Sequence, residues 1–445
     1  MAEKVTIIGA GLVGSLFSIY LARKGYHVDL FERRTDMRKE KISAGKSINL
    51  ALSDRGWKAL ELIGVAEEVK KVAIPMHGRM VHDVKGELSF YPYGKDSQSI
   101  YSVSRGGLNS TLMNLAESHP NLSLYFNEKC IDVNLDSSEI IFENQASKNK
   151  VSVYGNKIIG ADGAFSTARL ALQMTDRFNY SQEYLEHGYK ELTIPANTDG
   201  TWKIEKNALH IWPRGEYMLI ALPNLDGSFT CTLFFPFEGE NSFGTLKTAK
   251  DVSAFFEKVF PDAVSLMPTY VEDFENNPTS SLVMIKCNPW NYKDKLLLIG
   301  DASHGIVPFF GQGMNSGFED CTVLAELFEK HGEDWEKVFN SFSAIRKPDT
   351  DAICQLALNN YIEMRDLVAD PMFVLRKKIE SRFHQKYPDK WVPLYSMVTF
   401  SDMPYSAALK EGSFQDNIMK KILSIKNIEQ IWDSEEVEME ILKYF

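Results

Sequence analysis

The chain has 445 residues, of which 44% are hydrophobic and 24% charged, so it has enough apolar material for a folded core. Its 49 basic and 60 acidic residues give a formal net charge of −11, which argues against nucleic acid as the main partner, because phosphate backbones favour a basic surface. The five cysteines are far apart and include no C-x-x-C pair, which excludes that metal or redox motif and favours free thiols in a reducing compartment.

The sequence contains no apolar run of the ~20 residues that a membrane-spanning helix needs. The apolar stretch 5–8 is too short for the core of a signal peptide and leads directly into glycines. Residues 407–445 mix apolar side chains with many acidic and basic ones, a pattern typical of an amphipathic helix. We therefore expect a cytoplasmic protein without a membrane anchor.

The first 32 residues predict a strand at 5–8, a turn at 9–14, a helix at 15–24 and a second strand at 27–32. A βαβ unit of this length implies that its two strands pair in parallel. The turn reads G-x-G-x-x-G, whose glycines permit a tight turn, close approach of a pyrophosphate and close packing of helix on strand. Glu32, at the end of the second strand, is placed to hold an adenosine ribose. This motif predicts a dinucleotide site but does not separate FAD from NAD.

The rest of the chain mixes helical periodicity with strand alternation. Alternation between 187 and 237, with a hairpin turn at 224–227, predicts an antiparallel sheet inserted into an α/β protein. The remaining predicted elements are helices at 53–72, 106–118 and 312–330, strands within 76–104 and at 122–126, 129–134, 151–159 and 295–299, and mostly helix from 336 onward.

Two further segments predict a turn that leads from an apolar strand into a helix. One runs from Gly160 through Asp162 towards Arg169; the other contains Asp301 and His304 and continues to the glycines of 311–315. Asp301, at the carboxyl end of its strand, can hold a second ribose or a ribityl hydroxyl. The following helix N-terminus can face a flat ring that gains negative charge on reduction. His304 is either a general base or a histidine packed at the junction.

Together, and in this order, the three motifs resemble the flavoprotein aromatic hydroxylases of the 4-hydroxybenzoate hydroxylase superfamily, over residues 5 to about 330. Within it, segments along the whole chain resemble the kynurenine 3-monooxygenase family in its soluble bacterial form: 46–53, 77–82, 187–192, 207–213, 308–315, 360–364 and 395–400. The resemblance implies an α/β fold with an inserted antiparallel β-sheet. It also implies a discontinuous Rossmann-like FAD-binding domain (1–75, 101–180 and 285–330), a substrate domain (76–100 and 181–284) and a C-terminal helical region (331–445) that closes the substrate pocket.

The resemblance also implies the site residues. Those expected to contact FAD are Gly9, Gly11, Leu12, Val13, Gly14, Glu32, Arg33, Ala51, Arg105, Cys130, Asp162, Asp301, Gly311, Gly313, Met314 and Asn315. Arg79 would clamp the carboxylate of an amino-acid substrate, because a guanidinium offers a planar two-point contact, and Tyr93, Tyr395 and Asn360 would share it. The ring of the substrate would lie in an apolar slot formed by Leu222, Phe235, Pro308, Phe309, Phe310 and Met364.

The implied reaction uses tightly bound FAD, NADPH as a transient co-substrate and O₂, and converts L-kynurenine to 3-hydroxy-L-kynurenine through a flavin hydroperoxide. It would serve tryptophan degradation or the biosynthesis of quinolinate and NAD, without a metal, in a monomer or a homodimer. The basic loop of Arg33, Arg34, Arg38, Lys39 and Lys41 either attracts the 2′-phosphate of NADPH or is an ordinary solvated loop. The alternatives are a flavin hydroxylase of another aromatic acid, an FAD-dependent reductase of the same fold and a non-catalytic nucleotide-binding scaffold.

Overall fold

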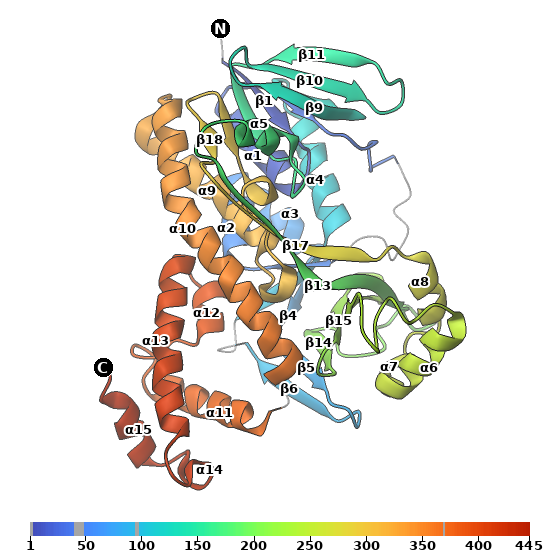
Figure 1. Cartoon of the computed structure of the whole chain (residues 1–445), viewed down its shortest axis with the longest axis vertical. Helices are drawn as coiled ribbons and strands as arrows, with labels where there is room; N and C mark the ends of the chain where they lie inside the picture. Colours follow the sequence, from blue (N-terminus) through green and yellow to red (C-terminus); the bar gives the residue numbers. More distant parts are fainter. Residues whose placement is uncertain (1–2, 40–48, 94–97, 368–369) are drawn as a thin grey trace.

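A mostly parallel sheet forms the upper half of the molecule (Figure 1). The computed structural model describes residues 3–39, 49–93, 98–367 and 370–445. The six strands follow the order β18-β19-β12-β1-β2-β8, and only the β18–β19 pair is antiparallel. Their bounds are β1 Lys4–Ile8, β2 His27–Phe31, β8 Leu122–Tyr125, β12 Lys157–Gly160, β18 Asn291–Tyr292 and β19 Leu296–Leu298.

The predicted βαβ unit is confirmed, including the parallel register of β1 and β2. Its helix α1 (Leu12–Arg23) begins earlier than predicted, so Gly14 lies inside the helix rather than in the turn. A Cβ on Gly14 would lie 2.0 Å from the Gly9 carbonyl oxygen, which explains why no larger residue fits. Helices α4 (Arg105–Glu117) and α9 (Gly313–His331) pack against α1 on this sheet.

A seven-stranded sheet forms the lower right of Figure 1, in the order β17-β13-β16-β15-β14-β5-β6. The predicted antiparallel region and its hairpin are confirmed by the pairing of β15 (Met218–Pro223) with β16 (Phe229–Pro236). The other strands are β5 Gly78–His82, β6 Leu88–Pro92, β13 Asn179–Ile194, β14 Ala208–Pro213 and β17 Ser280–Asn288. The parallel pairing of β14 with β5, and the helices α6 (Ala249–Val259), α7 (Pro261–Val264) and α8 (Tyr270–Asn276) on one face, were not predicted.

Two predicted elements are wrong in extent. The helix expected at 53–72 is two helices, α2 (Asp54–Leu62) and α3 (Ala66–Lys70), because Gly64 between them has φ +65°. The strand expected at 151–159 is also two strands: β11 (Lys150–Tyr154) joins β9 (Glu128–Asn134) and the unpredicted β10 (Glu139–Asn144), while β12 enters the parallel sheet. A further small sheet consists of β3 (Asn49–Leu52), β7 (Ile100–Ser104) and β4 (Ile74–Met76).

The chain ends in helices, as predicted. The 28-residue α10 (Trp335–Ile362) runs down the left side of Figure 1 and is followed by α11 (Pro371–Lys386), α12 (Leu394–Thr399), α13 (Tyr405–Leu423), α14 (Ile428–Ile431) and α15 (Glu435–Leu442). A shared apolar core joins α10, α12 and α13 to the seven-stranded sheet and to Phe309 and Phe310. Within the described ranges, no helix is both long and apolar enough to cross a bilayer.

A cluster of buried charges connects α9, α10 and α2. The Arg346 guanidinium donates to Asp320 Oδ1 at 2.9 Å and to Glu319 Oε2 at 2.6 Å, and Arg55 pairs with the other Glu319 oxygen. Asp320 Oδ2 lies 2.6 Å from His304 Nε2 and accepts the Gly300 backbone N–H at 2.9 Å. The cluster therefore holds the turn after β19 against both helices.

Replacing Arg346 with alanine should lower the free energy of unfolding by about 3–5 kcal/mol, because Asp320 would stay buried without its charge partner. Urea denaturation followed by circular dichroism measures this. The matched control is Lys58→Ala, whose ion pair with Glu326 is exposed on both sides and should contribute about 1 kcal/mol or less. Equal, small effects of the two substitutions would contradict a structural role for the buried cluster.

Candidate active site

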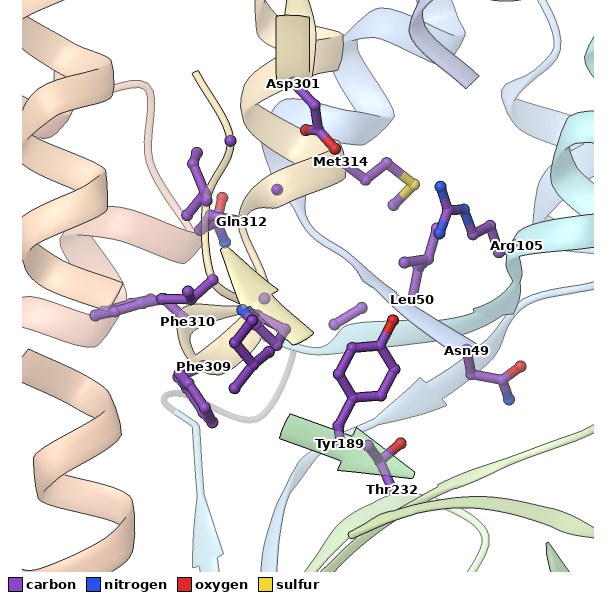
Figure 2. A pocket seen from close by; sticks show the side chains of 18 of the residues that line it. Asn49, Leu50, Arg105, Tyr189, Thr232, Asp301, Phe309, Phe310, Gln312 and Met314 are labelled. Carbon is purple, nitrogen blue, oxygen red and sulfur yellow. The ribbon is translucent and has the colours of Figure 1, made fainter. Parts of the chain in front are cut away.

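A cavity of about 400 Å³ lies where the two large sheets meet (Figure 2). One side is formed by the turn between β1 and α1, by β3, by Ile299 and Asp301 and by residues 311–314; the other is formed by β5, β13–β17, residues 305–310, Met364 and Tyr395. The lining is mostly apolar, with a few polar side chains that include Arg79, Arg105, Asp301 and Gln312. Apolar walls with few polar groups are typical of sites for small organic ligands.

The cofactor side of the cavity is built from helix N-termini. Gly11, Leu12 and Val13 open α1, and Gly311, Gly313 and Met314 lie at the start of α9; all six line the cavity. Neither N-cap residue, Gly11 or Gln312, provides a side-chain cap, so backbone N–H groups stay available to a negatively charged group. A Cβ on Gly11 would meet nothing within 4 Å, so this turn is open to an approaching phosphate. These residues fit a dinucleotide cofactor.

Arg105 and Asp301 supply charge on the same side. Figure 2 shows Asp301 above Met314 and the Arg105 side chain extending into the cavity from the right. Asp301 is exposed to the open cavity, but the surrounding protein still disfavours its charged form and raises its pKa, while the positive charge of Arg105 acts in the opposite direction. Arg105 has no ion pair with any described carboxylate, so its charge is free to meet an anionic ligand. Ala51, on β3, also lines the cavity, and its contact with FAD stays a prediction.

Several predicted cofactor residues lie behind the cavity wall. Gly9 and Gly14 pack against each other, and a Cβ on Gly9 would meet the Ala161 carbonyl oxygen at 2.4 Å. Asn315 accepts the Ser53 backbone N–H at 3.0 Å and donates to the Ala51 and Gly311 carbonyl oxygens. These three residues shape the backbone behind the wall, and none of them lines the cavity.

The other two acidic residues predicted to contact FAD, Glu32 and Asp162, have partners within the protein. Glu32 is buried; it accepts the Ala10 backbone N–H at 3.1 Å and pairs with Arg34 at 2.7 Å. Asp162 accepts the backbone N–H groups of Thr167 and Ala168 at the start of α5 (Thr167–Gln173), at 2.7 and 3.2 Å. The buried Cys130 contacts this helix through its carbonyl oxygen, which accepts the Thr167 hydroxyl. None of the three lines the cavity.

The basic loop after β2 is largely paired with acidic neighbours. Arg34 pairs with Glu32, and Arg38 and Lys39 pair with Asp36, at 2.8 and 3.8 Å respectively. Arg33 is exposed and does not line the cavity, and Lys41 lies outside the described residues. The loop therefore has less free positive charge than its sequence suggests.

On the opposite side, Arg79 of β5 lies beside a stacked pair of tyrosines. Its guanidinium is 4.7 Å from the centre of the Tyr395 ring and 5.8 Å from that of Tyr93, and these two rings stack at 5.0 Å. Although burial acts against the charged form, Tyr395 and Tyr93 raise the pKa of Arg79, so the side chain stays charged. Arg79 Nε and the Tyr93 hydroxyl are buried without a hydrogen-bond partner in the described part of the chain. No described carboxylate lies within ion-pair distance of Arg79, although Glu363 is near enough to help raise its pKa. The guanidinium and the Tyr93 hydroxyl therefore remain available to an anionic ligand.

Aromatic rings form the apolar wall beside Arg79. Phe309 stacks on Tyr361 at 4.1 Å and lies 4.9 Å from Phe234, while Phe310 stacks on Tyr395 at 5.5 Å. Pro308, Leu222 and Met364 also line the cavity, and their contact with a substrate ring stays a prediction.

The prediction for Phe235 is wrong. Side chains alternate across a strand, and β16 points Phe234 into the cavity but Phe235 to the opposite face, against Tyr217, Phe243 and Phe255. Both faces of β16 are buried, so hydrophobicity did not reveal which one borders the cavity.

Asn360 lies behind the residues that line the cavity. Its Nδ2 donates to the Phe309 carbonyl oxygen at 2.5 Å and contacts Met364 Sδ at 3.4 Å, and its side chain is not among those that line the cavity. It therefore fixes the backbone that carries Phe309. His304 is buried in the ionic cluster with Asp320 and does not line the cavity either.

Other residues that line the cavity were not predicted from the sequence. Strand alternation could have found the cavity-facing members of the sheet once one of them was known: Tyr189, Leu209, Met218, Ile220, Thr232 and Phe234. Gln312 was part of a motif but was not assigned a role. Glu191 shares the face of Tyr189 and pairs with Thr232 across strands, and burial raises its pKa to about 7 while Arg105 acts to lower it.

Comparison with known proteins agrees with this geometry. Residues 2–357 match a family model described as FAD binding domain. The chain is 54% identical over 441 residues to kynurenine 3-monooxygenase from Flavobacterium johnsoniae, covering 99% of this chain and 98% of that protein. It is 45% identical to kynurenine 3-monooxygenase from Anopheles gambiae, with coverage of 94% and 86%.

Solved structures share the fold at lower identity. A tetrameric form of 2-methyl-3-hydroxypyridine-5-carboxylic acid oxygenase aligns with a TM-score of 0.67 at 16% identity, covering 88% of this chain and 98% of that chain. The PqsL protein of Pseudomonas aeruginosa aligns with a TM-score of 0.64 at 17% identity, with coverage of 82% and 97%. The identity and coverage of the sequence relatives establish that this chain belongs to the kynurenine 3-monooxygenase family of FAD-dependent monooxygenases.

Proposed function

We propose that this protein hydroxylates L-kynurenine to 3-hydroxy-L-kynurenine, with FAD as its bound cofactor and NADPH and O₂ as co-substrates. The observation that carries this proposal is a charged, unpaired arginine in the wall of an otherwise apolar cavity that opens towards two helix N-termini. An amino acid with an aminophenyl ketone side chain has both features that such a cavity selects, an anionic head and a flat ring.

Arg79 binds the carboxylate of kynurenine. The guanidinium can form two parallel hydrogen bonds to one carboxylate, and the Tyr93 hydroxyl beside it adds a third donor. The stacked Tyr395 ring holds the guanidinium plane, because a cation is attracted to the face of an aromatic ring. Asn360 acts indirectly, by fixing the Phe309 backbone.

The aromatic wall receives the ring of the substrate. Phe234, Phe309 and Phe310 present flat apolar surfaces, with Leu222, Pro308 and Met364 around them. Burying the aminophenyl ring here removes it from water and leaves the head group on Arg79 as the fixed point. Exclusion of water also protects a reactive oxygen species from wasteful decay.

The opposite side holds FAD. The N-termini of α1 and α9 stabilise negative charge on the cofactor, Gly11 leaves room for the pyrophosphate, and Asp301 and Arg105 provide hydrogen-bonding partners. FAD held by these residues would supply the redox chemistry: with NADPH as reductant, one oxygen atom of O₂ would enter the ring and the other would leave as water. The division into an FAD-binding unit, a substrate-binding sheet and a C-terminal helical region is part of this proposal.

Purified protein should contain FAD and oxidise NADPH much faster when kynurenine is present. A panel of aromatic acids, phenols and kynurenine, followed by NADPH absorbance and product mass, tests this. Faster turnover of another aromatic acid would reassign the substrate. FAD-dependent NADPH oxidation without hydroxylated product would indicate a reductase, and a protein that takes up no FAD would contradict the whole proposal.

Arg79→Ala should weaken kynurenine binding by about 2–5 kcal/mol, the usual result of removing one member of a desolvated charge pair. FAD content should stay unchanged, because Arg79 lies on the substrate side. Calorimetric titration of the FAD-loaded variant measures this. Arg79→Lys is the matched control. It keeps the charge without the two-point geometry, so its affinity for kynurenine should fall between those of the natural protein and Arg79→Ala. Unchanged affinity in Arg79→Ala would refute the clamp.

Tyr395→Phe should reduce turnover while FAD content stays near that of the natural protein. The aromatic face under Arg79 is retained in this variant, so only the contribution of the hydroxyl is lost. Flavin absorbance after gel filtration and steady-state kinetics provide the two readouts. If the variant loses flavin instead, Tyr395 belongs to the cofactor side of the cavity.

A further inference from the structure

Gln312 presents an amide to the cavity from the turn that carries Phe309 and Phe310 (Figure 2). It is the N-cap residue of α9, and only 1% of its surface is exposed. Its side-chain oxygen Oε1 accepts a hydrogen bond from the Tyr405 hydroxyl at 2.9 Å. Its Nε2 has no hydrogen-bond partner among the described residues and is not sealed off as a buried, unsatisfied atom. That nitrogen is therefore the end of the amide that faces the cavity contents.

Tyr405 determines which end of the amide faces the cavity. In the described part of the chain, the Tyr405 hydroxyl has Gln312 Oε1 as its acceptor. If the amide rotated by 180°, Nε2 would face the hydroxyl and the hydroxyl hydrogen would lose that acceptor in a fully buried position, which is costly. The amide is therefore fixed with N–H towards the cavity.

Tyr405 is itself held in place. The Arg55 guanidinium lies 4.0 Å from the centre of its ring and is anchored by Glu319 and by the carbonyl oxygens of Val398, at 3.3 Å, and Met403. Burial raises the pKa of Tyr405, so the hydroxyl keeps its proton throughout the working pH range. The orientation of Gln312 thus rests on a protonated hydroxyl whose ring packs against the Arg55 guanidinium.

We propose that Gln312 donates a hydrogen bond to the ketone oxygen of the substrate, and that Tyr405 is a positioning residue that holds the amide in this donating orientation. The inference rests on the proposed function. The carboxylate of kynurenine is taken by Arg79, and its two nitrogen groups are mainly hydrogen-bond donors, so the ketone oxygen is the acceptor left for Nε2. A hydrogen bond from Nε2 to the ketone oxygen would fix the rotation of the aminophenyl ketone relative to the head group. It would thereby determine which ring carbon faces the cofactor.

The test compares two ligands on the FAD-loaded protein, with dissociation constants measured by calorimetry. One ligand is kynurenine; the other is 2-amino-4-(2-aminophenyl)butanoic acid, in which a CH₂ group replaces the ketone. Tyr405→Phe should weaken kynurenine binding about 3- to 10-fold, because the freed amide can turn its oxygen towards the ketone oxygen. Binding of the ketone-free ligand should change less than about twofold.

Variants at two other positions separate positioning from general damage. Tyr270→Phe removes a buried hydroxyl in another core, bonded to Ser253, and should change neither affinity. Gln312→Leu should weaken kynurenine selectively, and adding Tyr405→Phe to it should cause no further loss. If Tyr405→Phe does not fold, Gln312→Leu with the two ligands still decides the question.

Equal weakening of both ligands, or additive effects of the two substitutions, would overturn the role of Gln312. A loss of flavin affinity without ligand selectivity would overturn it too, and would place the amide against the cofactor. Failure of the natural protein to bind kynurenine at all would instead reject the proposed function, and this is read from the first titration before any variant is made.

Discussion

Arg346 carries a positive charge into the interior, where Asp320 and Glu319 neutralise it. Asp320 also accepts the Gly300 backbone N–H and contacts His304, so one carboxylate joins α9, α10 and the turn after β19. Separating any of these groups would leave a buried charge without a partner, which strongly favours a single arrangement. That turn and the N-terminus of α9 form the cofactor side of the cavity, so the cavity depends on an ionic cluster that does not line it.

The two sides of the cavity differ in how they provide polarity. On the cofactor side, positive potential comes largely from backbone N–H groups at helix ends, which need no particular side chain. On the other side it comes from the Arg79 guanidinium, which lies beside the stacked rings of Tyr93 and Tyr395. A fixed cation in apolar surroundings interacts strongly with an anion, because little water is present to screen the charge. The contrast suits a cofactor bound by its phosphates and a substrate recognised by its head group.

How much could be predicted from the sequence varied with the range of the interactions involved. The βαβ unit was predicted because its signals are local: an apolar strand, a glycine turn and a second strand. The break at Gly155 between β11 and β12 was missed because both halves look like strand and only their partners differ. Helix α6 went unpredicted, although Thr248 and Asp251 form a capping box that signals its start.

The site residues show the same dependence on the range of the interactions. Arg79, Tyr395, Phe309 and Phe310 lie at the cavity, where the family resemblance led us to expect them. Phe235 was misplaced because a strand buried on both faces gives no alternation to read. Glu32 and Asp162 have the residue type that a ribose site needs, but only coordinates reveal that Arg34 and the start of α5 use their oxygens. Tyr405 lies 93 residues from Gln312, and no local pattern connects them.

The match to the FAD-binding family ends at residue 357, yet the cavity wall does not. Met364 and Tyr395 lie beyond that boundary and line the cavity, and Tyr405, also beyond it, holds Gln312 from behind. The part of the chain that matches the FAD-binding family thus forms only part of the cavity wall, and helices beyond residue 357 form the rest. Substitutions in that last fifth could change the wall around the substrate while leaving the first four-fifths intact, which offers a route by which one flavin scaffold acquires new aromatic substrates.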